Sequence, residues 1–384
     1  MDIRPYQIRI DDRSLADLRQ RLENIRWPRS FDAEGWEDGA SLGFMRRLMQ
    51  YWQSQFDWRE QEARLNQLPQ FQAEVGNLSL HFVHQRGLGP NPLPLVLTHG
   101  WPGSFVEMET ILPLLADPQS HGGDPHDAFH VVVPSLPGYG FSAAPDRQGF
   151  SSSDIAALWF ELMNALGYRR FGAQGGDIGA GVSTWLAHLH PEAVVGYHLN
   201  YISGGYRPPL GEGLPPITAE EQRFLDTTAA WYAEEGAYAH LQGTKPQTLA
   251  YALNDSPAGL AAWIVEKLRA WSDSYGDVEQ VFSFDTLLTD ISLYWFSGTV
   301  DATLRLYKAN RLKPLRLEPG ERVEPPLGVA VFPRELPMPP RSWVERGHNV
   351  VRWSEMPRGG HFAALEQPEL LAEDIRAFFR PLRD

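Results

Sequence analysis

One acidic residue stands at the centre of a glycine-rich stretch, QGGDIGAG, at residues 174–181. Asp177 follows the strand-like segment RRFGAQG and precedes a helical pattern of apolar residues. A carboxylate there lies near a helix N-terminus, where free N–H groups and partial positive charge favour an anion. It is either a plain helix cap or a nucleophile exposed at a sharp strand-to-helix turn. The stretch alone leaves both interpretations open.

Two further motifs have the positions that nucleophilic catalysis requires. HGWPGS, at residues 99–104, directly follows the strand-like LPLVLT and predicts a tight turn. A backbone N–H in such a turn can stabilise an oxyanion. RGGHFAALEQPE places His361 on a glycine-rich turn before the last helical pattern. A base at that place, after a nucleophile and an acid, follows the chain order of α/β-hydrolases.

The acid that orients this base should stand at the end of a strand between Asp177 and His361. Glu335 fits, because it comes just past the strand-like GVAVFP and 26 positions (361 − 335) before His361. Asp290 and Asp301 lie in the same interval and are the alternatives, although either could be a solvated surface carboxylate. We favour Glu335 over both.

The elements that must hold these residues change character along the chain. Residues 1–75 read as a helical N-terminal arm, with Ile25–Pro28 as an expected anchor on the core. From residue 76 to 204, short strand-like runs alternate with helical segments, which predicts a mostly parallel sheet covered on both faces. Residues 205–325 read as a helical lid, and residues 326–384 complete the core with a strand and a closing helix. The sequence thus predicts an α/β fold of the α/β-hydrolase type.

Composition narrows the classes of partner. The chain has 384 residues, no cysteine and a formal net charge of −14. An acidic chain is a poor ligand for nucleic acid or an anionic membrane surface, and zero cysteines exclude disulfides and thiol catalysis. The charged N-terminus shows no signal peptide, and no apolar run reaches the length of a membrane span. We therefore expect a soluble, cytoplasmic protein without a membrane anchor and without a nucleic-acid partner.

Motifs along nearly the whole chain resemble those of the microsomal-type epoxide hydrolases and their soluble bacterial relatives. They are IRWP, HGWPGS, LPGYGFS, QGGDIGAG, TKPQTLAYALNDSPAGLAAWI, RLYKANR, FPRE and MPRGGHFAALEQPELLAEDIR. The family's nucleophile, acid and base are the aspartate of GGD, the glutamate of FPxE and the histidine of RGGH. The resemblance therefore implies these roles for Asp177, Glu335 and His361. It also matches the family's two lid tyrosines to Tyr238 and Tyr307.

This sequence departs from the family in two places. We expect no membrane anchor of the kind that the microsomal members have, and Ile178 follows the nucleophile where the mammalian members have tryptophan. The change to isoleucine alters the pocket but keeps the backbone N–H. We expect the N–H groups of Trp101 and Ile178 to form the oxyanion hole.

An aspartate nucleophile suits the opening of an epoxide. Aspartic acid has an ordinary pKa of about 3.9, so it is ionised at neutral pH without help from a base. It can attack carbon and form an ester, which a histidine-activated water then hydrolyses. Two phenols supply hydrogen bonds or protons to the epoxide oxygen, so the expected product is a vicinal diol.

Two other functions stay open at this point. A haloalkane dehalogenase needs N–H donors around the halide, commonly from a tryptophan after the nucleophile, which Ile178 cannot supply although Trp101 has an indole N–H. A non-catalytic binding protein of the same fold would be expected to lose a catalytic position. We expect no cofactor and no metal, because the histidines of HGGDPHDAFH read as a polar loop. The expected partners are a small epoxide and water, and a homodimer is one assembly that the sequence leaves open.

Overall fold

A nine-stranded sheet forms the centre of the protein, in a computed structural model that describes residues 2–383. Neighbouring strands follow the order β1-β2-β3-β5-β4-β6-β7-β8-β9. The pairs β1–β2, β2–β3 and β3–β5 are antiparallel, and the other pairs are parallel. The strand bounds are β1 Ile3–Pro5, β2 Gln70–Val75, β3 Leu78–Gln85, β4 Leu93–Thr98, β5 Phe129–Pro134, β6 Phe171–Gly175, β7 Val194–Leu199, β8 Val323–Val331 and β9 His348–Glu355.

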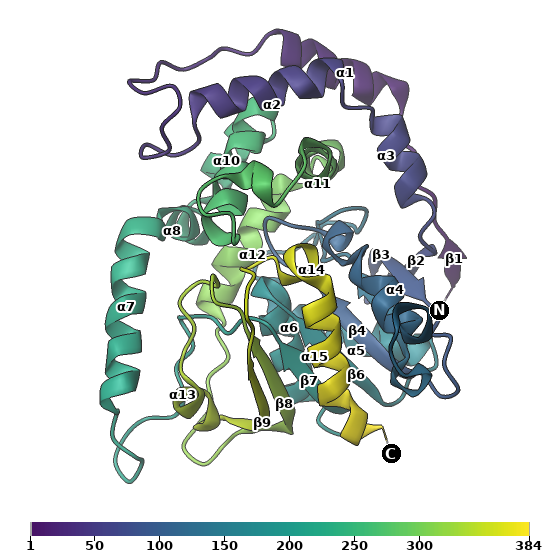
Figure 1. The fold of residues 1–384 in the computed structure, drawn as a ribbon, viewed down its shortest axis with the longest axis vertical. Helices are drawn as coiled ribbons and strands as arrows, with labels where there is room; N and C mark the ends of the chain where they lie inside the picture. Colours follow the sequence, from purple (N-terminus) through teal and green to yellow (C-terminus); the bar gives the residue numbers. More distant parts are fainter. Residues whose placement is uncertain (1, 384) are drawn as a thin grey trace.

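Alternate residues of the central strands supply a separate apolar core on each face of the sheet. In β4, Leu95 and Leu97 pack on the side of helices α4 and α15, whereas Val96 packs on the side of α5 and α6. This follows from the two-residue period of a strand. The expected sheet, covered by helices on both faces, is confirmed (Figure 1). The core helices are η1 Phe105–Met108, α4 Ile111–Ala116, η2 Pro118–His121, η3 Pro125–Asp127, α5 Ser152–Ala165, α6 Asp177–Leu189, α13 Arg341–Glu345, α14 Ala363–Glu366, α15 Pro368–Phe379 and η5 Arg380–Leu382.

The ends of the sheet differ from the sequence interpretation. β9 was not among the predicted strands; its residues HNVVRWSE are mostly half-buried or exposed because it is an edge strand paired only with β8. An edge strand needs little apolar sequence, so its pattern is weak. β8 begins at Val323, inside the range assigned to the lid. β1 and β2 lie within the range assigned to the helical arm, so that region is not wholly helical.

Six α-helices are inserted between β7 and β8, and α7 runs down the side of the core whereas the others lie near the carboxyl ends of the parallel strands (Figure 1). Tyr294 Oη donates to the carbonyl of Gly103 at 2.8 Å, and Thr299 Oγ1 donates to the carbonyl of Gly138 at 2.7 Å. These contacts place the lid helices on the edge of the sheet where the candidate site lies. The lid helices are α7 Ala219–Glu235, α8 Ala237–Thr244, α9 Pro246–Leu253, α10 Pro257–Trp271, α11 Phe284–Ser297 and α12 Val300–Leu312. The short helix η4 Val278–Gln280 lies between α10 and α11.

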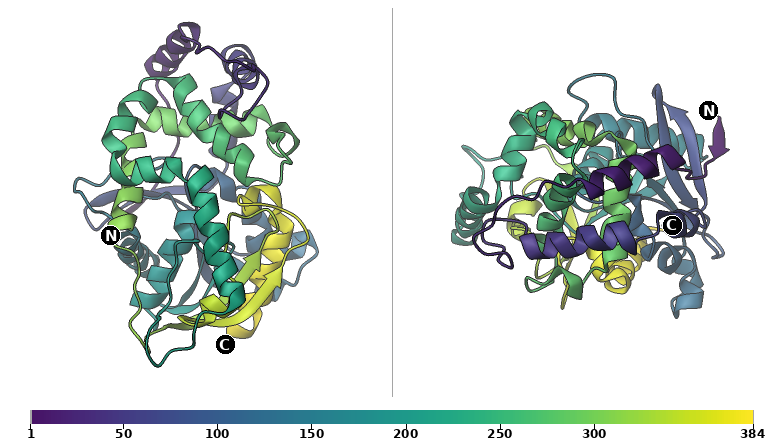
Figure 2. Two further views of the ribbon diagram at one scale, coloured as in Figure 1. Left: turned by 90° about the vertical axis from the view of Figure 1, so that its left-hand side faces the viewer. Right: turned by 90° about the horizontal axis from the view of Figure 1, so that it is seen from above.

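The arm crosses the outer side of the lid (Figures 1 and 2). Its helices are α1 Asp12–Glu23, α2 Leu42–Ser54 and α3 Trp58–Leu65. Tyr51 Oη donates to Asp285 Oδ1 of α11 at 3.1 Å, and Arg21 pairs with Asp255 at 2.8 Å. Leu48 of α2 is fully buried. Burying such a side chain contributes about 1.5–3 kcal/mol, more than an exposed ion pair does.

The anchor expected at Ile25–Pro28 is limited to Ile25, which packs against the core, whereas residues 26–28 are exposed. Ile25 is only partly buried, and Trp27 is 37% exposed. The arm is held instead by the apolar stripes of its helices, for example Leu22 and Trp52, at 2% and 5% exposed. A proline-rich segment outside a helix has no regular apolar face to bury, whereas an amphipathic helix presents one along its whole length.

Candidate active site

Asp177 stands at a strained turn between β6 and α6. Its φ is +46°, a value that a residue with a side chain adopts at a cost of about 1–3 kcal/mol. The crowding around the turn requires glycine on both sides. A Cβ on Gly175 would lie 2.3 Å from the carbonyl carbon of Gly179, and one on Gly179 would lie 2.0 Å from the carbonyl oxygen of Thr98. The turn thus exposes the carboxylate as the sequence pattern predicted.

The turn after β4 meets this carboxylate. Trp101 N–H donates to Asp177 Oδ1 at 2.8 Å. Gly100 permits the approach, because a Cβ there would lie 2.4 Å from the same oxygen. Ile178 begins the first turn of α6, where backbone N–H groups have no partner within the helix. The two backbone groups expected in an oxyanion hole are therefore next to one carboxylate.

His361 lies between two carboxylates. Its Nδ1 is 2.5 Å from Glu335 Oε1, and its Nε2 is 3.4 Å from Asp177 Oδ2. Burial alone would lower the pKa of His361, but the negative charges of Glu335 and Asp177 outweigh it and raise the pKa well above the usual value. The imidazole is therefore an imidazolium in the free protein at neutral pH.

Of the three candidate acids, Glu335 contacts the base. It follows β8, and its Oε1 also accepts from Leu336 N at 2.7 Å, which fixes the carboxylate. Asp290 instead accepts from Ser104 Oγ at 2.6 Å, and Asp301 pairs with Arg305 on the same helix at 2.6 Å.

The two lid tyrosines lie together above the oxyanion turn. Tyr238 of α8 and Tyr307 of α12 have ring centroids 5.9 Å apart, and both rings contact Trp101, at 5.5 and 5.7 Å. Burial, and then the nearby charge of Asp177, raises the pKa of Tyr238 well above its usual value. Burial, followed by Tyr238 and Asp177, does the same for Tyr307. Both groups are neutral phenols that can donate a hydrogen bond.

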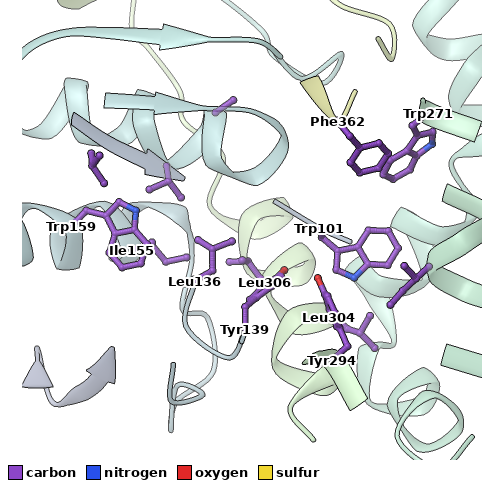
Figure 3. Packing of buried hydrophobic residues seen from close by; sticks show 14 of the residues in the cluster. Trp101, Leu136, Tyr139, Ile155, Trp159, Trp271, Tyr294, Leu304, Leu306 and Phe362 are labelled. Carbon is purple, nitrogen blue, oxygen red and sulfur yellow. The ribbon is translucent and has the colours of Figure 1, made fainter. Parts of the chain in front are cut away.

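The cavity at the centre of the site is small. It measures about 20 Å³ and is lined by Asp177, His361, Trp101 and their neighbours. Aromatic side chains pack closely nearby. Figure 3 shows Trp271 and Phe362 near Trp101, and the rings of Trp271 and Phe362 are stacked with centroids 6.3 Å apart. This volume suits water rather than an organic substrate. The cavity lies on the side of Asp177 that faces Glu107 and His361, and the two lid tyrosines are not among its lining residues.

A carboxylate that the sequence analysis missed holds the base turn. Glu366 accepts from three backbone N–H groups: Phe362 at 2.9 Å, Gly360 at 3.0 Å and Asp273 at 2.7 Å. Burial raises its pKa to about 7, against the effect of these hydrogen bonds. The only signal in the sequence is an acidic residue five positions after His361 in an apolar run, which does not reveal the contact with the lid.

Comparisons with known proteins agree with this arrangement. The family described as Epoxide hydrolase N terminus matches residues 3–108, and that described as alpha/beta hydrolase fold matches residues 94–258. A putative epoxide hydrolase of Stigmatella aurantiaca (strain DW4/3-1) is 45% identical over 99% of this chain and 86% of its own length. Epoxide hydrolase 1 of Oryctolagus cuniculus is 39% identical over 98% of this chain and 88% of its own.

The chain belongs to the microsomal-type epoxide hydrolase family.

Solved structures agree with the sequence relatives. The structure of Aspergillus niger epoxide hydrolase is similar with a TM-score of 0.85 and 33% identity, over 100% of this chain and 97% of that one. The chain is thus an epoxide hydrolase with the α/β-hydrolase fold. No helix between residues 2 and 383 combines the length and apolarity that crossing a bilayer requires. Within the same residues, no cluster of three or more histidine, aspartate or glutamate side chains is arranged to hold a metal ion.

Proposed function

We propose that this epoxide hydrolase works through a covalent ester on Asp177. The observation that supports this most directly is a chain of four groups, Trp101 N, Asp177, His361 and Glu335, in which neighbours are 2.8, 3.4 and 2.5 Å apart. One oxygen of Asp177 is held by an oxyanion donor, and the other faces the base. This is the arrangement that attack on carbon followed by hydrolysis requires.

In the first step, Asp177 Oδ2 attacks an epoxide carbon and the C–O bond of the ring breaks. Tyr238 and Tyr307 donate to the leaving oxygen, and one phenol transfers its proton as the alkoxide forms. The imidazolium of His361 replaces that proton. The products are a hydroxyalkyl ester, two neutral phenols and a neutral imidazole, so charge and protons balance.

Ester formation itself prepares the base. While Asp177 is ionised, its carboxylate helps to keep the pKa of His361 high. Esterification removes that negative charge, so the pKa of His361 falls and the neutral imidazole can accept a proton. Glu335 stays as the partner of Nδ1, which keeps Nε2 directed at the ester and stabilises the imidazolium when it forms again.

In the second step, His361 Nε2 takes a proton from water while the oxygen attacks the carbonyl carbon of the ester. The oxyanion forms on Oδ1, where the N–H groups of Trp101 and Ile178 stabilise it, each worth about 3–4 kcal/mol. The bond between this carbon and the diol oxygen then breaks, and His361 returns the proton to that oxygen. The carboxylic acid that forms on Asp177 then gives its proton to His361 Nε2. This restores the imidazolium and the Asp177 carboxylate, which now carries one oxygen from water.

Single-turnover labelling in heavy-oxygen water tests this proposal. With protein in excess over styrene oxide, the first diol should be unlabelled and the label should enter Asp177. Label in the diol of the first turnover would mean that water opens the ring directly. Halide release from a chloroalkane tests dehalogenation, which the isoleucine at position 178 disfavours. A cytoplasmic location and a homodimer stay predictions.

A further inference from the structure

The Glu107 side chain lines two neighbouring water-sized cavities. The first is the catalytic cavity of about 20 Å³ that also touches Asp177 and His361. The second, again about 20 Å³, lies under the lid against Gly103 and Asp290. Each is large enough for an ordered water molecule. Glu107 is thus a polar wall residue common to both.

Each cavity has buried polar atoms in its wall that lack a hydrogen-bond partner among residues 2–383. In the first these are His361 Nε2 and Gln174 Oε1, on side chains that are 5% and 1% exposed as residues. In the second it is Asp290 Oδ2. Buried polar atoms almost always have a partner, and ordered water is the usual one where protein supplies none. Both cavities therefore have the chemistry of water sites.

The position of Glu107 is set by the oxyanion turn. The Glu107 side chain packs against Gly103, where an added Cβ would lie 1.2 Å from Glu107 Oε1 and would displace the carboxyl group. Ser104 caps the short helix η1, which carries Glu107, by accepting from Val106 N at 3.3 Å. The same hydroxyl donates to Asp290 Oδ1 at 2.6 Å and so ties the helix to the lid. The carboxyl group is consequently held at one place beside the base.

We propose that Glu107 is a positioning residue for the water that hydrolyses the Asp177 ester. This inference rests on the covalent mechanism proposed above. The water donates one hydrogen to a carboxyl oxygen of Glu107 and the other to His361 Nε2. His361 removes the second hydrogen as a proton when the oxygen attacks, whereas Glu107 gains and loses no proton. The second cavity, beside Asp290, supplies the next water.

The charge state of Glu107 agrees with this role. Burial, and then the charge of Asp290, raises the pKa of Glu107 well above its usual value. Asp177 also raises this pKa, whereas His361 lowers it. Tyr294 also faces this group, as a neutral phenol whose own pKa is raised by burial. A neutral Glu107 accepts a hydrogen bond from water without competing with Asp177 for the imidazolium.

Three variants separate positioning from general damage. Glu107→Leu removes the acceptor at similar size, Glu107→Gln keeps an acceptor oxygen that cannot ionise, and Glu109→Gln is the matched control. Glu109 is two residues along the chain, pairs with Arg64 and does not line either cavity. Rapid-quench experiments with styrene oxide measure ester formation and ester hydrolysis separately, by intact mass.

Glu107→Leu should form the ester at nearly the wild-type rate but hydrolyse it about 10- to 100-fold more slowly. This is the scale of effect expected when a reacting group is displaced by roughly 1 Å. Glu107→Gln should recover most of the hydrolysis rate, and Glu109→Gln should match the wild type in both steps. Equal slowing of both steps in Glu107→Leu, or unchanged hydrolysis, would overturn the inference. An ester that never forms in the wild-type protein would refute the covalent mechanism instead.

Discussion

Replacing His361 by glutamine is expected to stop the enzyme at the ester. The variant keeps Asp177 and the Trp101 N–H that holds its Oδ1 at 2.8 Å, so attack on the epoxide still occurs. Hydrolysis loses the nitrogen that lies 3.4 Å from Asp177 Oδ2 and accepts the proton of water. A positioned general base contributes about 10²–10⁴-fold. If both steps were equally fast in the wild type, even 10²-fold slower hydrolysis would leave about 99% of the variant as ester at saturating epoxide.

Intact-mass spectrometry with excess styrene oxide measures this directly. The His361→Gln protein should gain one substrate mass, and peptide mapping should locate the addition on Asp177. Asp177→Asn is the control and should gain no mass in the first minutes, before deamidation restores the carboxylate. A His361→Gln protein that turns over without an adduct, together with label in the first diol of the wild type, would refute the covalent route.

Three further predictions address the lid, the base and the arm. Tyr238→Phe or Tyr307→Phe should slow ester formation, and the double variant should slow it much more than either, because the alkoxide then has no donor; rapid-quench rates measure this. The rate of ester hydrolysis should rise with pH, with a pKa below that of His361 in the free enzyme, because esterified Asp177 no longer raises the pKa of His361. Single-turnover decay of the ester across pH gives the first pKa, and an NMR titration of the free enzyme gives the second. Equal values would contradict the prediction. Deleting residues 1–60 should give insoluble or inactive protein, and a stable, active truncation would show that the arm is dispensable.

The residues that local sequence patterns identify share one property, which is that each lies in a turn, whereas Tyr238 and Tyr307 lie in helices and were matched only through the family resemblance. The glycines around Asp177 and His361 mark turns whose geometry is set within a few residues. The acid is harder to identify from the residues alone, because three candidate carboxylates lie between Asp177 and His361. The position of Glu335 after the end of β8 brings this carboxylate to the base. A role that depends on contact between distant segments leaves little local pattern.

The carboxylates outside the predicted triad illustrate this limit. Glu366 accepts from Asp273 N, 93 positions away in the chain, and Ser104 donates to Asp290, 186 positions away. Neither pairing follows from periodicity or turn signals, since both depend on how the lid packs on the core. The same holds for the strands β1 and β2, which the helical character of their surroundings concealed.

The base and the two proton donors are held by different helices of the lid. Helices α1 and α2 pack on α10 and α11, and the carbonyl of Trp271, the last residue of α10, accepts from His361 N at 2.9 Å. The arm therefore braces the helix that holds the base. Tyr238 and Tyr307 instead come from α8 and α12, which pack on each other. The base can therefore stay aligned with Asp177 while the proton donors bind the epoxide oxygen.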